Sequence, residues 1–425
     1  MHFGIITPPV QGHLIPFGAL GRELIARGHR VTVIQMADTR ERVRAEGLEF
    51  APIGQSDHPP GSLPESLAQL GQLRGFAALR FTIAAVRKTT EMLCRDAPAA
   101  IRTAGIEMLL VDQTEPGGGT VAEHLGLPFV TICNALVLNR EAAVPPPFTS
   151  WRPRDGWWQE MRNEMGYAIS AQVTSPVARV VARYRRLWNL PAHRRPEDSF
   201  SKLAQISQQP VEFDFPRREL PDCFHYAGPL RDLRGEEIPF PWHKLDGRAL
   251  VYASLGTLQY SKEEVFRCFA EACAGLNDVQ LVMAHCGGLS DAAVHSLPGD
   301  PVSVVYAPQA ALLQRARLAL THAGLNTVLD ALRFGVPIVA VPITYEQPAI
   351  AARVKWAGAG KSLPLARLTA ARLRATIREV LDNPAYAQRS QHIAAAMRRA
   401  GGAACAASII ENVAREVVPE CRSGR

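Results

Sequence analysis

Short apolar runs alternate with amphipathic stretches in two separate parts of the chain, and this alternation limits the fold more than any other feature. Near the N-terminus, residues 2–7 predict a strand, residues 14–26 a helix and residues 30–35 a second strand. The alternation restarts with an apolar strand at residues 250–254. Strands that alternate with helices are typical of doubly wound parallel sheets, which bind ligands at the carboxyl ends of their strands. The sequence therefore predicts an α/β protein with two such sheets.

The length of 425 residues is sufficient for two buried cores. We expect an N-terminal domain at residues 1–230, a linker rich in proline, glycine and charge at 231–247, and a C-terminal domain at 248–400. A terminal helix or tail at 401–425 is expected to pack back on the N-terminal domain. Prolines and tryptophans gather between residues 145 and 196, which predicts an irregular insert there.

Charge and cysteine usage exclude several classes of protein. The net charge is +7, but no basic run is interleaved with aromatics, so phosphate ligands or a lipid surface are favoured over nucleic acid. The eight cysteines form no CxxC pair or metal-ligand spacing and are expected to be reduced thiols. Neither a secretory signal nor an unbroken apolar run of about 18 residues is apparent. We therefore expect a cytoplasmic protein, with peripheral membrane contact as an open alternative.

The segment 321–327, between a predicted strand and a predicted helix, has the features of a diphosphate site. The start of a helix offers unpaired backbone N–H groups and a partial positive charge. Gly324 permits close approach, and His322, Asn326 and Thr327 carry polar side chains. By themselves these residues fit equally well as a helix cap and a turn.

A longer motif around this segment resembles the donor signature of the UDP-glycosyltransferases, which have the GT-B fold of two Rossmann-like domains facing across a cleft. The residues that carry the resemblance are Ser254, Thr257, Tyr306, Gln309, His322, Gly324, Asn326, Thr327, Asp330, Glu346 and Gln347. The resemblance implies that Tyr306 and Gln309 meet the uracil and that Asp330 binds the ribose. It further implies that Ser254, Thr257, His322, Asn326 and Thr327 bind the pyrophosphate, and that Glu346 and Gln347 bind the transferred sugar.

The motif departs from the plant members of the family at four positions. Tyr306 and Leu325 replace tryptophans, Asp330 replaces a glutamate and Glu346 replaces an aspartate. The positions of Leu325 and Glu346 lie near the hexose in the family, so the identity of the sugar is less firmly implied than the nucleotide. An Asp-x-Asp pair of the kind used to hold a divalent ion is lacking, so we expect neither a metal nor another cofactor.

His13 and Asp112 are the candidate catalytic pair. His13 follows the first predicted strand in a Gly-His sequence, and Asp112 ends the predicted strand at 106–111. An imidazole with a pKa near 6.5 suits a general base, although a histidine in such a loop is as readily structural. In the UDP-glycosyltransferases the base occupies the Gly-His position and an aspartate orients it, which implies these roles for His13 and Asp112. Glu115 is expected to be solvated or to cap a helix.

Most of the chain resembles the bacterial enzymes that glucosylate zeaxanthin more than it resembles plant or macrolide enzymes. Segments 134–141, 203–208, 213–218 and 223–228 carry this similarity, and segment 318–330 fits the same group. It implies UDP-glucose as donor, a carotenoid hydroxyl as acceptor and a β-glucoside as product. An apolar acceptor requires an apolar channel, and the candidates for its walls are Phe76, Leu79, Phe81, Ile83, Phe148, Trp151, Trp157 and Trp158.

Residues 177–188 predict an amphipathic helix with several arginines, which fits either packing on the core or contact with anionic lipid. Three other functions remain open. A macrolide, flavonoid or sterol could replace the carotenoid, the enzyme could be a sugar-nucleotide epimerase, or the chain could bind UDP-sugar without catalysis. A dinucleotide-dependent dehydrogenase is disfavoured because the first turn, residues 8–12, lacks GxGxxG.

Overall fold

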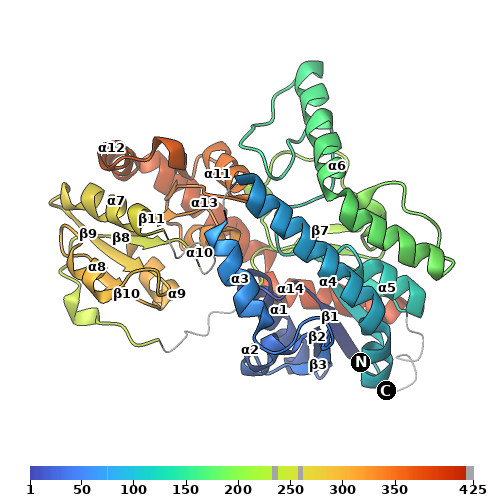
Figure 1. The fold of residues 1–425 in the computed structure, drawn as a ribbon. Helices are drawn as coiled ribbons and strands as arrows, with labels where there is room; N and C mark the ends of the chain where they lie inside the picture. Colours follow the sequence, from blue (N-terminus) through green and yellow to red (C-terminus); the bar gives the residue numbers. More distant parts are fainter. Residues whose placement is uncertain (74, 232–237, 257–261, 418–425) are drawn as a thin grey trace.

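The computed structural model describes residues 1–73, 75–231, 238–256 and 262–417. Each of two lobes is built on its own parallel sheet, and the chain passes from the first lobe to the second near residue 240 (Figure 1). The GT-B expectation of two Rossmann-like domains is confirmed.

The N-terminal sheet has seven parallel strands in the order β3-β2-β1-β4-β5-β6-β7. Its elements are β1 (His2–Ile6), α1 (Gln11–Ala26), β2 (Arg30–Met36), α2 (Arg40–Ala45), β3 (Glu49–Ile53), α3 (Ser62–Gln72), α4 (Gly75–Ala104), β4 (Met108–Asp112), α5 (Gly118–Leu125), β5 (Phe129–Cys133), α6 (Trp157–Leu187), β6 (Gln205–Ser207) and β7 (Phe224–Tyr226). The order reverses between β1 and β4, and such a reversal opens a crevice at the carboxyl ends of the two strands.

The second sheet has six parallel strands in the order β10-β9-β8-β11-β12-β13. Its elements are β8 (Ala249–Ser254), α7 (Glu263–Ala274), β9 (Val279–Ala284), α8 (Asp291–His295), β10 (Val302–Val304), α9 (Gln309–Leu313), β11 (Ala316–Thr321), α10 (Leu325–Arg333), β12 (Ile338–Ala340), α11 (Gln347–Trp356), β13 (Gly360–Ser362), α12 (Ala370–Asp382) and α13 (Pro384–Ala400). The reversal here lies between β8 and β11, so this domain also has its crevice at strand ends.

Both sheets are covered on both faces, which explains why their strands read as continuous apolar runs. In the first domain, Phe3 and Ile5 belong to a core on one face, while Ile6 and Val111 belong to a core on the other face that includes α4. Every residue of β1 and β4 is buried.

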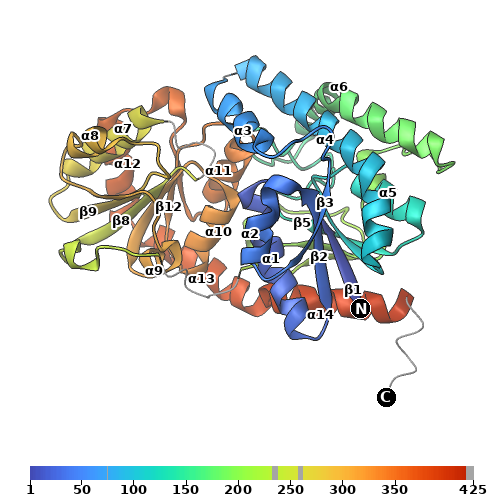
Figure 2. The ribbon, with the colours of Figure 1, turned by 60° about the horizontal axis from the view of Figure 1, so that its bottom comes forward.

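The last helix, α14 (Gly402–Val417), returns to the first domain and runs beside α1 under its sheet (Figure 2). Ile410 and Ala406 are fully buried in the same core as Phe3. Together α13 and α14 form the one stretch, among the described residues, that is long and apolar enough to cross a membrane, with a mean hydropathy of 1.2. The two helices are separated at Gly401, which has a φ of 88° and ends α13 in the left-handed region.

The expectation of an irregular insert at residues 145–196 is wrong for residues 157–187. Residues 157–187 form α6, a 31-residue helix that contains Pro176. The amphipathic part of α6 packs on the core, with Val177, Val180 and Val181 buried. Clustered tryptophans and a proline obscured the helical period, because one half of α6 carries apolar side chains on its exposed face as well.

A buried ion pair joins the two domains. Arg353 in α11 donates from Nε to Oδ1 of Asp214 over 3.0 Å, and both side chains are at most 1% exposed. Arg217 binds the other carboxylate oxygen, and the Arg353 guanidinium lies 4.1 Å from the ring centroid of Phe215. These contacts fix α11, and the loop that precedes it, against the N-terminal domain.

Candidate active site

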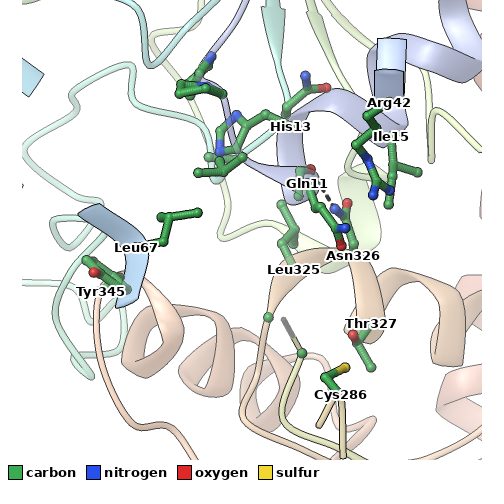
Figure 3. Close-up of a pocket in the computed structure, with 18 of the residues that line it drawn as sticks. Gln11, His13, Ile15, Arg42, Leu67, Cys286, Leu325, Asn326, Thr327 and Tyr345 are labelled. Atoms are coloured by element: carbon green, nitrogen blue, oxygen red, sulfur yellow. Dashed lines mark hydrogen bonds between the residues drawn. The ribbon is translucent and has the colours of Figure 1, made fainter. Parts of the chain in front are cut away.

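A cavity of about 1630 Å³ lies between the two domains. Its walls include His13 and Gln11 at the start of α1, and Leu325, Asn326 and Thr327 at the start of α10 (Figure 3). These two helix starts follow β1 and β11, so the strand-end crevices of both sheets open into one space. The volume exceeds the roughly 300–1,000 Å³ of a typical small-molecule site, which is consistent with room for two ligands.

The structure places His13 and Asp112 in direct contact, with His13 Nδ1 donating to Asp112 Oδ2 over 2.8 Å. Adjacent strands bring them together. Strands β1 and β4 pair as far as Ile6 and Val111; Asp112 directly follows Val111, and His13 lies shortly after the end of β1. Helix α1 begins at Gln11, so His13 lies in its first turn rather than in the loop before it. Asp112 is fully buried, whereas the His13 side chain is 20% exposed and lines the cavity.

The pKa values of this pair suit a general base and a carboxylate that orients it. Burial by itself would lower the pKa of His13, but the carboxylate of Asp112 outweighs it and holds that pKa above its ordinary 6.5. Burial would raise the pKa of Asp112, but His13 and two donors from Thr114 hold it below its usual range. Asp112 therefore stays ionised and fixes the Nδ1–H tautomer, which leaves Nε2 as the basic atom.

Glu115 also lines the cavity. Helix α5 begins after Gly117, and no side chain of the described residues caps it, so the capping role expected for Glu115 is wrong. Burial, followed by repulsion from Asp112, raises the pKa of Glu115 to about 8. Glu115 is therefore mostly protonated at neutral pH and is able to donate a hydrogen bond into the cavity.

His322 is held between two glycines in the donor half of the cavity. A Cβ atom would come within 2.7 Å of the His322 ring at Gly256 and within 2.5 Å at Gly324. Burial lowers the pKa of His322 to about 4, so the ring is neutral and acts as a hydrogen-bonding group. Ala323, between His322 and Gly324, has a φ of 66°, a conformation that non-glycine residues seldom adopt and that gathers at functional sites.

Helix α10 begins directly after this turn, and none of the side chains that the structure describes caps its N-terminus. The backbone donors of its first turn are therefore left for a ligand. The Asn326 side chain is engaged with the other domain. Its Nδ2 donates to the carbonyl of Gly12 over 2.6 Å, and its Oδ1 accepts from Gln208 over 3.2 Å (Figure 3).

Asp330 and Gln309 lie together, since Gln309 Nε2 donates to Asp330 Oδ2 over 2.7 Å. Sequence reasoning missed Arg231, which lines the same region and forms a two-point ion pair with Asp330 at 2.7 and 3.2 Å. Its position in the expected linker gave no signal of this contact.

The remaining residues that were expected to bind the nucleotide sugar also line the cavity; they are Ser254, Tyr306, Thr327, Glu346 and Gln347. Gln347 Oε1 accepts from the backbone N–H groups of residues 343 and 344, at 2.8 and 2.9 Å, which shapes the loop before α11. Tyr345, with a φ of 55°, lines the cavity from this loop and was missed by sequence reasoning. Thr257 lies outside the described residues.

The structure does not place the expected acceptor residues Phe76, Leu79, Phe148, Trp151 and Trp157 among those that line the cavity. Phe76 and Trp157 are 73% and 61% exposed, and the guanidinium of Arg162 covers the ring of Trp151 at 4.4 Å. Of the expected wall residues, Phe81 of α4 does line the cavity, whereas Ile83 and Trp158 do not. The rest of the apolar wall comes from Leu63, Leu67 and Leu70, spaced along one face of α3, and from Ala85 of α4.

No group of three or more His, Cys, Asp or Glu side chains within the described parts of the chain is arranged to hold a metal ion.

Comparisons with known proteins agree with this geometry. Residues 10–131 match the glycosyltransferase family 28 N-terminal domain, and residues 274–412 match the C-terminal domain of erythromycin biosynthesis protein CIII-like proteins. The chain is 38% identical to zeaxanthin glucosyltransferase of Pantoea ananas, over 97% of this chain and 96% of that protein. It is 36% identical to zeaxanthin glucosyltransferase of Pseudescherichia vulneris, over 96% and 97% of the two chains.

Solved structures share the fold at lower identity. The calicheamicin glycosyltransferase CalG4 superimposes with a TM-score of 0.76 at 23% identity, over 98% of this chain and 99% of that one. The glycosyltransferase VinC, solved in complex with DTDP, gives a TM-score of 0.71 at 20% identity, over 98% and 100%. With two parallel sheets, a cavity between them and near full-length relatives, the chain belongs to the UDP-glycosyltransferase family of GT-B enzymes.

Proposed function

We propose that this enzyme transfers glucose from UDP-glucose to a hydroxyl of a carotenoid such as zeaxanthin and forms a β-glucoside. The observation that carries the proposal is the single cavity that joins the His13–Asp112 pair to the uncapped start of α10 and continues along the apolar face of α3. The names of the two zeaxanthin glucosyltransferases that match nearly the whole chain support glucose as the transferred sugar and zeaxanthin as the acceptor.

In the proposed reaction, His13 Nε2 takes the proton from the acceptor hydroxyl as its oxygen attacks the anomeric carbon of glucose. The bond between that carbon and the UDP oxygen breaks on the opposite face, and UDP leaves with the electron pair. An α-linked donor thus becomes a β-glycoside. Asp112 stabilises the imidazolium that forms, as a carboxylate does for the histidine of a hydrolytic triad.

The leaving diphosphate is proposed to be stabilised without a metal ion. Its donors are the first-turn N–H groups of α10, the neutral His322 ring and the hydroxyls of Thr327 and Ser254. Turnover that is unchanged after treatment with a chelator supports this arrangement, and loss of turnover that added Mg²⁺ restores contradicts it.

The apolar arm of the cavity favours a transferase over an epimerase, because an epimerase needs no second, apolar site. Leu63, Leu67 and Leu70 present a stripe that suits a rigid hydrocarbon. Tyr345 lines the same cavity from the C-terminal domain (Figure 3). Protonated Glu115 is placed beside His13, where it can hydrogen-bond the acceptor hydroxyl.

Product analysis tests the proposal. Incubation with UDP-glucose and detergent-dispersed zeaxanthin is expected to give glucosides that mass spectrometry detects, with stoichiometric release of UDP. Glycosylation of a macrolide, flavonoid or sterol but not of zeaxanthin would exclude the carotenoid acceptor. Conversion of UDP-glucose without an acceptor would support an epimerase instead.

A variant pair tests the apolar arm. Leu67→Asp is expected to raise KM for zeaxanthin about tenfold or more, because it places a carboxylate against the hydrocarbon, and to leave UDP affinity unchanged. Leu203→Asp is the matched control, since Leu203 is 39% exposed in the same domain and is not among the cavity residues. Equal KM values for the two variants would contradict this assignment of the acceptor site.

A further inference from the structure

Helix α6 carries an apolar face that nothing in the described part of the chain covers. Large side chains recur along it at intervals of about one turn, and they are Trp157, Trp158, Met161, Met165 and Ile169, each between 44% and 61% exposed. We call these five residues the apolar face of α6. Asn163, Gly166 and Tyr167, on the other side of the same turns, are the residues buried against the protein.

This half of α6 thus turns its large apolar side chains to water, beside the exposed Glu160 and Glu164, whereas an ordinary surface helix buries its apolar side chains against the core. It also projects beyond the rest of the fold (Figure 1). Exposed apolar patches of this kind mark contact surfaces. The stacked rings of Trp157 and Trp158, with centroids 3.7 Å apart, stand at the start of the helix. Tryptophan is enriched where protein meets the boundary between lipid and water.

The second half of the helix carries positive charge on the same side. Arg179 lies 18 residues after Met161, and Arg183 lies 18 residues after Met165, which is about five turns of an α-helix in each case. Arg179, Arg183 and Arg186 line a groove with Arg87 of α4, where one carboxylate, Glu91, pairs with Arg183. The groove thus keeps an excess of positive charge farther along the helix that carries the apolar face.

The groove adjoins the acceptor arm of the active-site cavity. Arg87 lines both spaces, so one turn of α4 separates the cavity from the basic groove under α6. A ligand held by a surface against α6 would therefore be close to the acceptor arm.

We propose that the apolar face of α6 and the arginines that continue it dock the enzyme on a bilayer that contains anionic lipids. The apolar side chains enter the boundary between head groups and acyl chains, and the arginines meet the phosphates. A second copy of the chain fits less well, because a twofold contact would set the basic grooves of the two copies close together. The proposal rests on the proposed function in one respect. Docking serves the enzyme because the acceptor is dissolved in the membrane, and docking brings the cavity to that acceptor.

The sequence left membrane contact through residues 177–188 open, and the proposed surface lies mainly on the preceding turns of the same helix. Arg185 is buried and donates to Glu123 and Thr120, and Arg183 is paired with Glu91. Arg179 and Arg186 are the exposed arginines that remain in this part of α6.

Vesicle co-sedimentation without any substrate tests the docking surface. The enzyme is expected to bind phosphatidylcholine vesicles that contain about one-third phosphatidylglycerol, and to bind them less in about 0.5 M NaCl. The triple variant Met161→Ser, Met165→Ser, Ile169→Ser should lower the partition at least about tenfold. The double variant Arg179→Gln, Arg186→Gln should weaken binding to anionic vesicles and leave binding to phosphatidylcholine alone unchanged.

The matched control is Leu203→Ser with Val211→Ser, which removes exposed apolar side chains from the same domain but not from α6. Its partition should equal that of the unmodified enzyme. The far-ultraviolet circular dichroism spectrum should be unchanged in every variant, because the replaced side chains are exposed. UDP affinity, measured by titration, should also be unchanged, because these residues lie outside the cavity.

Equal partition of the triple variant and the unmodified enzyme would overturn the proposal, as would a lack of binding to anionic vesicles. A stable dimer that the triple variant dissociates would overturn it in favour of self-association. Glucosylation of zeaxanthin in detergent is the separate readout of the proposed function. If that reaction proceeds while vesicle binding fails, the docking surface is wrong and the proposed function stands.

Discussion

Replacement of Asp112 by asparagine perturbs the proposed base without removing it. Oδ1 of Asp112 accepts from the backbone N–H and the hydroxyl of Thr114, at 2.9 and 2.7 Å. Oδ2 accepts from His13, Thr7 and Asn134, at 2.8, 3.2 and 3.1 Å. A backbone N–H cannot rotate away, so the amide nitrogen of Asp112→Asn is expected to take the Oδ2 side.

There the amide donates to His13 Nδ1 and forces the proton of the neutral ring onto Nε2, the atom that must accept the proton of the substrate. The buried imidazolium also loses its counter-ion. Loss of a positioned base costs a factor of about 10² to 10⁴ in kcat, or about 2.7 to 5.5 kcal/mol in the barrier. Because the tautomer itself is wrong, a higher pH should not restore the rate.

Steady-state release of UDP, measured with zeaxanthin as acceptor at several pH values, gives kcat for the variant. UDP affinity should be unchanged, since Asp112 lies in the sheet of the other domain. Asp96→Asn is the matched control, because Asp96 is also an ion-paired acid of the first domain but does not line the cavity. A kcat for Asp112→Asn within about a factor of ten of the control would refute the assignment of His13 as a base oriented by Asp112.

Three further outcomes are expected. Because the pKa of His13 is raised and the base acts in its neutral form, kcat/KM should fall as the pH drops through a value above 6.5. A kcat/KM that stays constant as the pH is lowered through this range would argue against His13 as the base. Gly324→Ala should weaken UDP binding about tenfold or more in calorimetry, since its Cβ would displace His322. Gly71→Ala is the control and should leave UDP binding unchanged, because a Cβ at Gly71 meets no atom within 4 Å. Arg353→Met should cost about 3 kcal/mol in chemical denaturation, because it removes one of the partners of a buried carboxylate; a loss under about 0.5 kcal/mol would mean that the interdomain pair contributes little.

The βαβ pattern and the donor motif could be predicted from sequence because each is local. Alternation of strands and helices has a short period, and the turn from His322 to Gly324 needs a glycine for its close approach to the ring. The family resemblance added the roles of His13 and Asp112. Their contact is then a consequence of strand order, since β1 and β4 are neighbours in a doubly wound sheet.

The acceptor wall was not predictable in the same way. Phe76 and Trp157 are apolar, but the direction in which each side chain points depends on how α4 and α6 pack, and both are exposed. Leu67 of α3 reaches the cavity although α3 buries none of its residues fully. Hydrophobicity indicates that a side chain prefers to leave water and does not specify what covers it.

The sequence by itself determined the fold class, the phosphate-binding turn of the second domain and the histidine at the start of α1, because these depend on residue spacing within one element or one turn. Only the tertiary structure decided which charges are paired and which groups are buried. The ion pair of Asp330 with Arg231 and the engagement of Asn326 with Gly12 arise between segments far apart in the chain, and burial in the folded protein raises the pKa of Glu115. Burial and counter-ions are set by packing across the domain boundary, and no local pattern of residues encodes them.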